Sequence, residues 1–429
     1  MKTNVRTYAV PLPGFAAVGR TLMALLLAAV YWTDVRQYFG SSSPPRLVFA
    51  VSALLVPVSA YFYILVRRFW GIALAKRSCR IQESAALVTA TAVLVPSMQI
   101  FGTPILLVLH VVVLGLLMEL LYSLSVRLGW GRGRLWRMLY LSGVIPLAGV
   151  LPLAGVLLLG GFGAVNIRRP VVTEYTVTTD KPLPPDGYTI ALITDLHYGN
   201  ALTAEDLSAD VRTLASFRPN LVLLGGDIVD ERTDRKEMKE AFALLSRIPV
   251  GDGTYYVYGN HDKALYTSKP AFTPGELAET VETAGISILE DRSAVLPSGM
   301  TVTGRQDRSD PMRTGVPRAD AASLMEGLDP QAYHILLDHQ PREFEANAAA
   351  GYDLMLSGHT HSGQIWPLGL LVEALDRGTI LYGHEIRGGM DVIVSSGLAG
   401  WGYPIRTEGH SEAVIIRIVN PAQGRSAEN

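Results

Sequence analysis

Cysteine is almost absent from this chain of 429 residues, in which Cys79 is the single example. One cysteine cannot form a disulfide within the chain, and it cannot supply the several thiolates of a cysteine-rich zinc site. Any metal site must therefore be built from carboxylates, imidazoles and amides. The redox compartment stays open on this count.

Acidic residues are scarce in the first 170 residues, where 16 lysines and arginines face only Asp34, Glu83 and Glu119. The rest of the chain has the opposite balance, with 21 basic against 36 acidic side chains. The overall charge of −2 hides this asymmetry. Because proteins neutralise nucleic-acid phosphates with Lys and Arg, the acidic part of the chain disfavours duplex nucleic acid as a partner.

Long hydrophobic runs occur only in the basic part. Each run has roughly the 17 to 25 residues that a helix needs to cross a bilayer. The runs lie near Phe15 to Trp32, Leu47 to Val66, Ala85 to Phe101, Pro104 to Leu124 and Leu139 to Val165. We therefore predict an α-helical transmembrane bundle of about five spans at residues 1–168. The first run is interrupted by Arg20 and could instead be a cleaved signal sequence.

Two basic loops indicate how these spans are oriented. Residues 67–84 hold five Lys and Arg side chains and residues 126–138 hold four, whereas residues 99–103 hold no charge. The positive-inside rule places both basic loops in the cytoplasm. The fifth span then ends outside, so we expect the residues after about Asn166 to be extracytoplasmic. Arg168 and Arg169 count mildly against this orientation.

Two ionisable side chains, His110 and Glu119, fall within the fourth run. Such groups are costly in a bilayer, and by default they indicate a functional role. Glu119 lies near the end of the run, so its side chain can instead reach the membrane surface. The sequence leaves both interpretations open.

From Pro170 onward, short alternating segments replace the long apolar runs. Strands are expected at Val171 to Thr178, Thr189 to Thr194, Leu221 to Leu224, Thr254 to Tyr258, Ser287 to Leu289, Thr301 to Thr303, His334 to Leu337, Leu354 to Leu356, Asp391 to Ser395 and Ala413 to Val419, and helices at Ala201 to Phe217, Ala241 to Ser246 and Pro274 to Ala284. This alternation predicts a layered α/β domain at residues 169–419. Residues 420–429 are polar, and we expect a mobile tail there.

Side chains that can bind metal ions, all Asp, Asn or His, follow five of the expected strands. They are Asp195, His197, Asp227, Asn260, His261, His339, His359 and His361, and they include five of the nine histidines. Ligands gather at the carboxyl ends of strands in open α/β sheets, so we expect these side chains to converge. Oxygen and nitrogen ligands without a thiolate suit Mn, Fe or Zn better than Mg or Ca. Each motif is weak alone, but the set is typical of a two-metal site.

In these motifs the chain resembles the calcineurin-like metallophosphoesterase superfamily. The resemblance is carried by Asp195-Leu196-His197, Gly226-Asp227, Gly259-Asn260-His261-Asp262, His339 and Gly358-His359-Thr360-His361. The chain is most similar to the bacterial membrane-associated branch, which includes UDP-2,3-diacylglucosamine pyrophosphatases, through residues 337–341, 358–364 and 396–398. It departs from many relatives at Ser362, where they have glycine.

The resemblance implies a sandwich of two β-sheets flanked by helices, in a protein of the bacterial cell membrane. It implies that one metal ion is held by Asp195, His197 and His361, that a second is held by Asn260, His339 and His359, and that Asp227 bridges the two. It also implies that His261 acts as a general acid or charge stabiliser. Asp262 is the expected partner that orients His261.

The predicted activity is hydrolysis of a phosphomonoester or phosphodiester, including a lipid-linked or pyrophosphate substrate. Two bound cations can activate water and clamp the attacking and leaving oxygens of an in-line displacement. Trp366, Trp401 and Arg406 are candidates for substrate binding, because arginine forks onto phosphate oxygens, but the sequence is equally consistent with core and surface positions for them. The alternatives are a membrane sensor whose phosphoesterase domain is catalytically silent, and a nuclease, which the acidic charge disfavours. No obligate protein partner is indicated.

Overall fold

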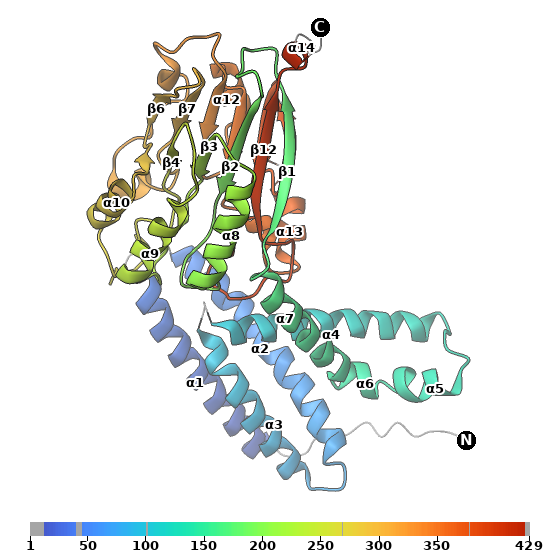
Figure 1. Cartoon of the computed structure of the whole chain (residues 1–429). Coiled ribbons are helices and arrows are strands. Elements are labelled where there is room, and N and C mark those ends of the chain that lie inside the picture. The colour runs from blue at the N-terminus through green and yellow to red at the C-terminus, as the bar shows by residue number, and fades with distance from the viewer. Residues whose placement is uncertain (1–12, 40–44, 100–101, 268, 377, 425–429) are drawn as a thin grey trace. The chain divides into compact units, whose positions relative to one another are not determined.

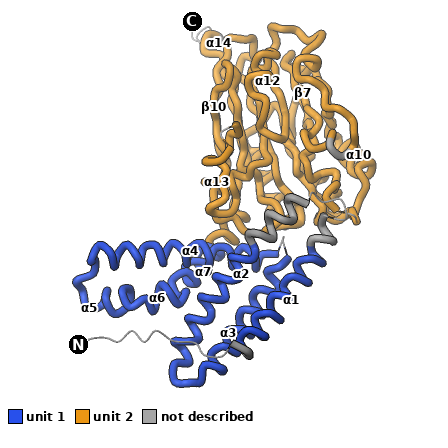
Figure 2. Tube along the Cα trace, turned by 180° about the vertical axis from the view of Figure 1, so that it is seen from behind, with its two compact units in different colours: residues 1–161 blue, residues 162–429 orange. Residues whose placement is uncertain are grey.

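The computed structural model describes residues 13–39, 45–99, 102–267, 269–376 and 378–424. The chain divides into two compact units, unit 1 at residues 1–161 and unit 2 at residues 162–429 (Figure 2). The expected domain boundary at residue 168 stays a prediction. Of the tail expected at residues 420–429, Pro421–Gly424 form helix α14, and residues 425–429 lie outside the described residues.

Unit 1 is helical. Its helices are α1 (Pro13–Phe39), α2 (Pro45–Ala73), α3 (Cys79–Leu94), α4 (Thr103–Arg127), α5 (Arg134–Trp136), α6 (Val144–Leu147) and the greater part of α7 (Val150–Asn166), with a 3-10 turn at Pro96–Met98 and a π-helical turn at Arg137–Leu141. Many leucines on these helices are exposed, among them Leu120 of α4 and Leu158 of α7. Exposed apolar surface of this extent suits contact with lipid rather than with water.

Three helical stretches of the described residues are long and apolar enough to cross a membrane. They are Ala16–Asp34, Cys79–Met98 and Thr103–Arg127. A fourth span is possible if the bent pair Arg134–Leu147 and Val150–Asn166 counts as one. The structure therefore supports three or four of the five expected spans. The expected run Leu47 to Val66 lies within α2 but is not among these candidates, and the side chains of residues 45–54 are outside the described part.

The run Leu139 to Val165, expected to cross the bilayer as one helix, is interrupted in the structure. Its two halves are bent by 65°. Gly143 and Gly149 adopt φ values of +73° and +82°, which lie in the left-handed region that interrupts an α-helix. Continuous apolar composition hid this break, because glycine does not lower the hydrophobicity of a run enough to end it.

The acidic side chains of α3 and α4 pair with neighbouring arginines of α2. Glu83 accepts a hydrogen bond from Arg67 Nε at 2.9 Å, and Glu119 accepts one from Arg68. His110 bonds through Nδ1 to the backbone carbonyl one turn earlier, at 2.7 Å. Paired groups of this kind explain the tolerance of charge within an apolar unit. Glu119 is therefore held by a partner within unit 1, and the structure favours a structural role for it.

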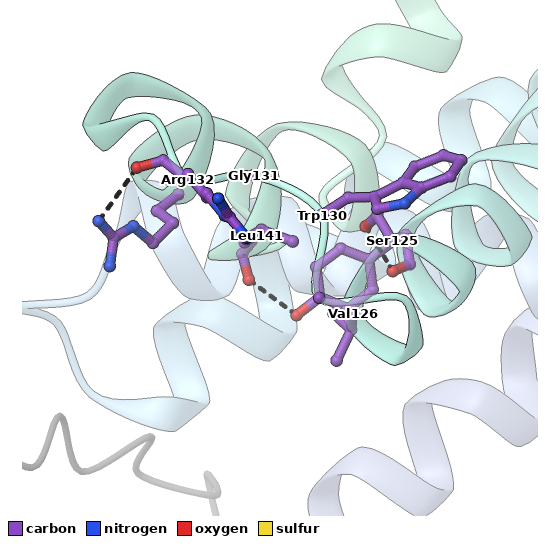
Figure 3. Close-up of a pocket in the computed structure, with 9 residues that line it drawn as sticks. Ser125, Val126, Trp130, Gly131, Arg132 and Leu141 are labelled. Carbon is purple, nitrogen blue, oxygen red and sulfur yellow. Dashed lines mark hydrogen bonds between the residues drawn. The ribbon is translucent and has the colours of Figure 1, made fainter.

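A pocket of about 550 Å³ lies in unit 1, beside the loop that follows α4 (Figure 3). It is lined in part by Tyr122, Trp130, Arg132 and Arg137. Two of its polar side chains bond to the backbone, since Tyr122 donates to the Leu141 carbonyl at 2.9 Å and Arg137 donates to the Arg132 carbonyl at 3.2 Å. The pocket contains none of the predicted site residues.

Unit 2 is built on two mixed six-stranded β-sheets. The first has the order β1 (Val171–Thr178), β12 (Glu412–Val419), β2 (Tyr188–Ile193), β3 (Leu221–Leu224), β4 (Thr254–Tyr256) and β5 (Ser287–Ile288). The second has the order β10 (Gly383–Arg387), β11 (Met390–Val394), β9 (Leu354–Ser357), β8 (His334–Leu337), β7 (Thr301–Gly304) and β6 (Arg292–Val295). Strands β2 to β5 run parallel, as do β7, β8, β9 and β11.

Helices cover the outer faces of the two sheets. Three helices pack against the first sheet, namely α8 (Ala204–Ser216), α9 (Arg235–Leu245) and α10 (Pro274–Thr283). Helix α12 (Phe344–Ala350) packs against the second sheet (Figure 1). Helices α8, α9 and α10 each begin with a capping box, at Thr203, Asp234 and Thr273, which fixes where each helix starts. Short helices at Pro311–Thr314 (α11) and Leu368–Leu375 (α13) and 3-10 turns at Ser323–Met325 and His361–Gly363 complete the unit.

Alternating strand residues divide the core into layers. In β2, Ile190 and Leu192 point between the sheets and pack with Ile335 of β8, whereas Ala191 and Ile193 belong to the cluster beneath the helices. Successive side chains of a strand face opposite sides, so one strand can serve both layers. The α/β sandwich expected for this part of the chain is confirmed.

Candidate metal centre

The predicted polar residues lie just beyond the carboxyl ends of five strands drawn from both sheets. Strands β2, β3 and β4 of the first sheet precede Asp195 and His197, Asp227, and Asn260 and His261, whereas β8 and β9 of the second sheet precede His339, and His359 and His361. The parallel direction of the central strands brings these ends to the same side of the sandwich. The expected convergence is therefore present.

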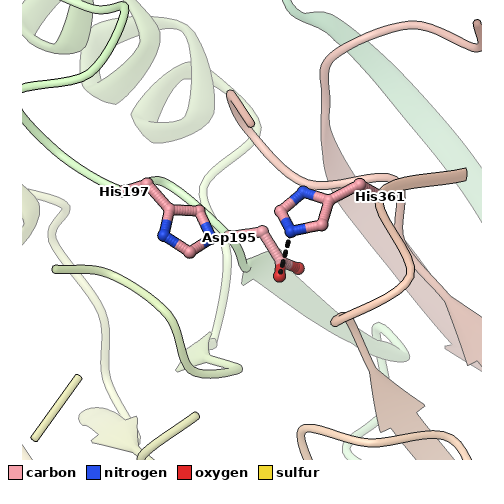
Figure 4. Close-up of side chains that lie close together, drawn as sticks. All are labelled: Asp195, His197 and His361. Carbon is pink, nitrogen blue, oxygen red and sulfur yellow. Dashed lines mark ion pairs between the residues drawn. The ribbon is translucent and has the colours of Figure 1, made fainter. Parts of the chain in front are cut away.

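One group of candidate ligands consists of Asp195, His197 and His361 (Figure 4). One ligand atom from each of these residues lies within 4.8 Å of the others. Nε2 of His361 is 3.5 Å from Oδ1 of Asp195. Asp195 and His197 are fully buried. A buried carboxylate beside two imidazoles is a donor set that suits a divalent transition metal.

A second group consists of Asp227, His339 and His359. Oδ2 of Asp227 lies 3.1 Å from Nε2 of His339 and 3.7 Å from Nε2 of His197, which belongs to the first group. The Asp227 carboxylate thus stands between the two groups. Oδ1 of Asn260 is 2.8 Å from Nδ1 of His359, so the Asn260 amide lies on the side of the second group.

The backbone is strained where the candidate ligands lie. Asp195, His197, Asp227, His359 and His361 have φ values of +50°, +42°, +53°, +72° and +51°. The left-handed region costs a residue with a side chain about 1 to 2 kcal/mol. Strained conformations of this kind cluster at functional sites, because the surrounding structure must hold them in place.

Glycines allow the ligand loops to approach one another. A Cβ atom on Gly259 would overlap the Asp227 carboxylate, and one on Gly358 would overlap the Asp195 carboxylate. Both positions therefore require glycine for steric reasons. The Gly that precedes Asn260 and the Gly that precedes His359 are thus part of the site.

Hydrogen bonds orient the imidazoles toward the two groups. Nδ1 of His339 lies 2.8 Å from the carbonyl oxygen of Gly225, which can only accept, so Nδ1 must donate and Nε2 is left toward Asp227. Nδ1 of His197 lies 3.2 Å from Oδ2 of Asp230. Nε2 of His197 is buried and has no hydrogen-bond partner among the described residues. A cation would satisfy this nitrogen, so the residues fit two divalent ions.

Replacement of Asp230 by alanine is expected to weaken metal binding by about 10- to 100-fold, the usual effect of losing a carboxylate that orients a histidine ligand. Calorimetric titration of metal into the stripped protein measures this affinity. Asp252→Ala is the control, because Asp252 accepts a hydrogen bond from Tyr188 at the opposite ends of the strands. An affinity unchanged by Asp230→Ala would show that His197 does not depend on this carboxylate.

His261 lies beside the metal groups at the edge of the buried region, with 12% of its side chain exposed. Its backbone N–H donates to Oδ1 of Asp227 at 2.8 Å, and its Nδ1 is 2.9 Å from a carboxylate oxygen of Glu231. The rings of Tyr266 and Trp401 each lie 4.9 Å from its ring. Burial opposes its charged form, but the Asp227 and Glu231 carboxylates outweigh burial and raise its pKa to about 9.

Asp262 does not contact His261 in the way we expected. Its fully buried carboxylate accepts hydrogen bonds from the backbone N–H groups of Gly259 at 2.6 Å, Asp227 at 2.7 Å and Ile228 at 2.9 Å. Neighbouring side chains leave the backbone in different directions, so adjacency to His261 did not predict contact. Asp262 holds the loop that carries Asp227, and Glu231 is the acid that contacts His261.

Sequence reasoning missed both Asp230 and Glu231. The signal was available, since both follow Asp227 within the same short loop. In metal sites, a carboxylate frequently accepts a hydrogen bond from the ring nitrogen of a histidine that does not face the metal. What the sequence could not supply was the pairing, which depends on how two loops from different strands meet.

The three candidates for substrate binding have different surroundings. Trp401 is at the site, because its ring lies beside that of His261. The Trp366 backbone N–H donates to the Thr407 hydroxyl at 3.0 Å, and the side chain is half-buried. Arg406 is fully buried, and its guanidinium donates to the carbonyls of His361 at 2.7 Å, Ser396 at 2.8 Å and Ala399. This position fits support of the His361 loop rather than contact with substrate.

Replacement of Arg406 by methionine is expected to lower the thermal midpoint of the protein and its metal affinity together. Each buried carbonyl that loses its donor costs about 1 to 3 kcal/mol. Thermal unfolding of the full chain in detergent measures the first effect. Arg417→Met is the matched control, because Arg417 forms a surface pair with Glu174, and such pairs contribute only about 0 to 1 kcal/mol. Equal midpoints for the two variants would contradict the supporting role.

The chain is similar in sequence to known proteins. Residues 188–363 match the family model for calcineurin-like phosphoesterases. An uncharacterized metallophosphoesterase of Helicobacter pylori strain J99 is 31% identical over 255 residues, which make up 59% of this chain and 65% of that protein. The match therefore spans just under two thirds of the Helicobacter protein's length.

Two further relatives are similar over shorter segments. The uncharacterized metallophosphoesterase YkuE of Bacillus subtilis is 30% identical over 213 residues, 48% of this chain and 71% of that protein. The phosphodiesterase YaeI of Escherichia coli is 29% identical over 179 residues, 42% of this chain and 62% of that protein. The family model itself, at residues 188–363, covers all of the candidate ligands.

Proposed function

Because this chain belongs to the calcineurin-like metallophosphoesterase family, we propose that it is a membrane-anchored hydrolase that cleaves a phosphomonoester or phosphodiester bond with two metal ions. The observation that carries the proposal is the position of the Asp227 carboxylate, 3.1 Å and 3.7 Å from imidazole nitrogens of the two groups. Oxygen and nitrogen ligands favour Mn, Fe or Zn.

We expect Asp195, His197 and His361 to hold one ion, and Asn260, His339 and His359 to hold the other, with Asp227 shared. When bound, two such cations activate water and neutralise charge on the phosphoryl oxygens. The protein contributes a rigid ligand cage, since the ligand loops are strained, closely packed at glycines and held from behind by hydrogen bonds. Positioning of this quality lowers the cost of orienting substrate for in-line attack.

His261 is proposed as the general acid. Its Nδ1 is engaged with Glu231, which leaves Nε2 for the substrate. The Asp227 and Glu231 carboxylates outweigh burial and raise the pKa of His261 to about 9 in the absence of metal ions, and the contact with Glu231 would support a protonated ring that donates to the leaving oxygen. The neighbouring ring of Trp401 would limit the access of water and flank the substrate. General acid catalysis typically contributes about 10²- to 10⁴-fold to rate.

The membrane arrangement is proposed as five spans with an extracytoplasmic catalytic unit. Three or four candidate spans are present, and α2 would supply the fifth. The basic loops at residues 67–84 and 126–138 support a cytoplasmic position for both. A cysteine introduced at exposed Val295 in a Cys79→Ala background tests the orientation with a membrane-impermeant label on intact cells. Labelling only after cell lysis would place the catalytic unit in the cytoplasm.

The substrate is proposed to be a phosphoester in or released from the membrane. An anchored enzyme encounters such molecules at high local concentration, and the relative YaeI is named a phosphodiesterase. Purified full-length protein incubated with total membrane lipid and Mn²⁺ should release a phosphorylated or dephosphorylated product that mass spectrometry identifies. Asp227→Ala provides the control. No product from lipid, together with turnover of a water-soluble phosphodiester, would exclude a lipid-borne substrate.

A further inference from the structure

Helix α13 (Leu368–Leu375) presents an apolar surface that the rest of unit 2 does not cover. Its exposed apolar side chains are Leu368, Leu370, Leu371, Val372 and Leu375, the last of which is 84% exposed. Glu373 is the single charged residue of the helix. The other large apolar side chains exposed in the described part of unit 2, such as Val295 and Ile386, are isolated in the sequence, and single exposed residues need no explanation.

The base of α13 is fixed to the loop that carries His361. The backbone N–H of Gly369 donates to the Glu408 carboxylate at 2.8 Å. A Cβ atom on Gly363, which ends the turn His361–Gly363, would lie only 2.5 Å from the Cα atom of Gly369. The helix therefore starts directly beside a candidate metal ligand.

The same segment that holds α13 also receives the end of α7. The Asn166 amide donates to the carbonyls of Arg406 at 3.1 Å and Gly409 at 2.9 Å, and the Arg406 N–H donates to the Gly163 carbonyl at 3.0 Å. Glu408, which anchors α13, lies between these positions. The last turn of α7 and the first turn of α13 are thus joined through residues 406–409.

Helix α7 is part of a candidate membrane span and carries no charged residue between Val150 and Asn166. Arg168 and Arg169 follow it at once and are exposed. A helix of this composition leaves the bilayer close to its last apolar turn, where arginine side chains meet the lipid headgroups. Figure 1 shows α13 toward the end of unit 2 at which β1 begins, which is the end that follows α7 in the chain.

We propose that α13 lies in the surface of the bilayer, with its leucines at the boundary between headgroups and acyl chains. Interfacial helices bury their apolar face about 5 to 10 Å into this boundary. The metal centre beside the base of α13 would then open onto the headgroup layer. This inference rests on the proposed function, and it narrows the substrate class to a phosphoester carried on a lipid.

The bilayer is the occupant that the structure favours for this face. Residues 406–409 connect α13 to the end of α7, which belongs to a bent helix pair that is apolar enough to enter a membrane, so lipid would be present there without any further partner. A single charge in eight residues also suits lipid better than a polar protein surface. A second copy of the chain is the other possible cover, and it is an outcome of the test below.

The direct test places an environment-sensitive fluorophore on α13 in the full-length protein. Leu371→Cys and Leu375→Cys, each in a Cys79→Ala background, are labelled and reconstituted into phosphatidylethanolamine and phosphatidylglycerol vesicles that contain a nitroxide-bearing lipid. Val295→Cys and Ile386→Cys are matched controls, because these residues are 67% and 68% exposed and lie at the opposite ends of the strands. We expect roughly twofold stronger quenching on α13 than at the controls.

Equal quenching at all four positions would overturn the proposal. So would efficient cross-linking of the introduced cysteines between the α13 helices of two copies, because a second copy would then cover this face. A second measurement separates this outcome from failure of the proposed function. The variant Leu370→Asn/Leu371→Asn/Leu375→Asn should hydrolyse bis(p-nitrophenyl) phosphate as the unmodified protein does, yet release about tenfold less product from vesicle lipid. Absence of turnover of the soluble diester by the unmodified protein would instead contradict the proposed function, and the quenching result would still stand.

Discussion

Replacement of Asp227 by alanine is expected to remove nearly all phosphodiesterase activity and to lower the metal content of the protein. Asp227 faces both ligand groups, so its loss affects both ions at once. Losing even an outer partner of a metal ligand typically costs about 10- to 100-fold, and we therefore expect more than about 100-fold here. Turnover of bis(p-nitrophenyl) phosphate with added Mn²⁺ and elemental analysis of the same sample measure the two effects.

Loss of Asp227 also removes an acceptor that the fold uses, since its Oδ1 accepts the His261 N–H at 2.8 Å. The variant Asp227→Asn keeps this acceptor and the volume of the side chain but removes the negative charge. We expect its activity to lie between those of the alanine variant and the unmodified protein. Two metal ions and full turnover in Asp227→Ala would show that the carboxylate is not shared.

Replacement of His261 by alanine is expected to separate metal binding from catalysis. His261 contacts Asp227 through its backbone, which alanine retains, and its ring is not part of either ligand group. The variant should keep both metal ions and lose about 10²- to 10⁴-fold in turnover, the usual contribution of a general acid. Steady-state kinetics and elemental analysis on one preparation test both parts of this expectation.

Glu231→Gln is the companion variant for His261. Glutamine can still accept a hydrogen bond at the position of the Glu231 carboxylate, but it no longer stabilises the charged ring. We expect a smaller loss of turnover than for His261→Ala and a shift of the alkaline limit of activity to lower pH, because the folded-state pKa of His261 falls toward its ordinary value. Loss of metal in His261→Ala would make His261 a ligand and would refute the assignment.

The strands were predictable where apolar alternation is framed by turns. Strands β1, β3 and β8 begin and end at the expected residues, and the site could be placed at the strand ends for the same reason. Strands β6 and β10 were missed because they lie at sheet edges, and Arg292 to Val295 and Gly383 to Arg387 are exposed or half-buried throughout. These two segments show no alternation of apolar and polar residues, so periodicity did not reveal them.

The parts of the site that escaped prediction depend on contacts between loops far apart in the chain. The guanidinium of Arg406 suggested phosphate binding, yet it donates hydrogen bonds to backbone carbonyls of two other segments, at His361 and Ser396. Asp262 was expected to orient His261, but Glu231, for which the sequence suggested no role, makes that contact, because side-chain direction follows the local backbone. In unit 1, Gly143 and Gly149 interrupt a helical run whose apolar composition looked continuous.

The candidate ligands come from both halves of the sandwich, and this has a thermodynamic consequence. Asp195 and His197 follow a strand of one sheet, whereas His361 follows a strand of the other. A single cation bound to all three would therefore cross-link the two sheets at the carboxyl ends of their strands. Ligands that bind only the native state stabilise it by mass action. The thermal midpoint of unit 2 should therefore rise with the concentration of free metal. A chelator should lower this midpoint, and it should weaken the packing between the two sheets before the helices unfold.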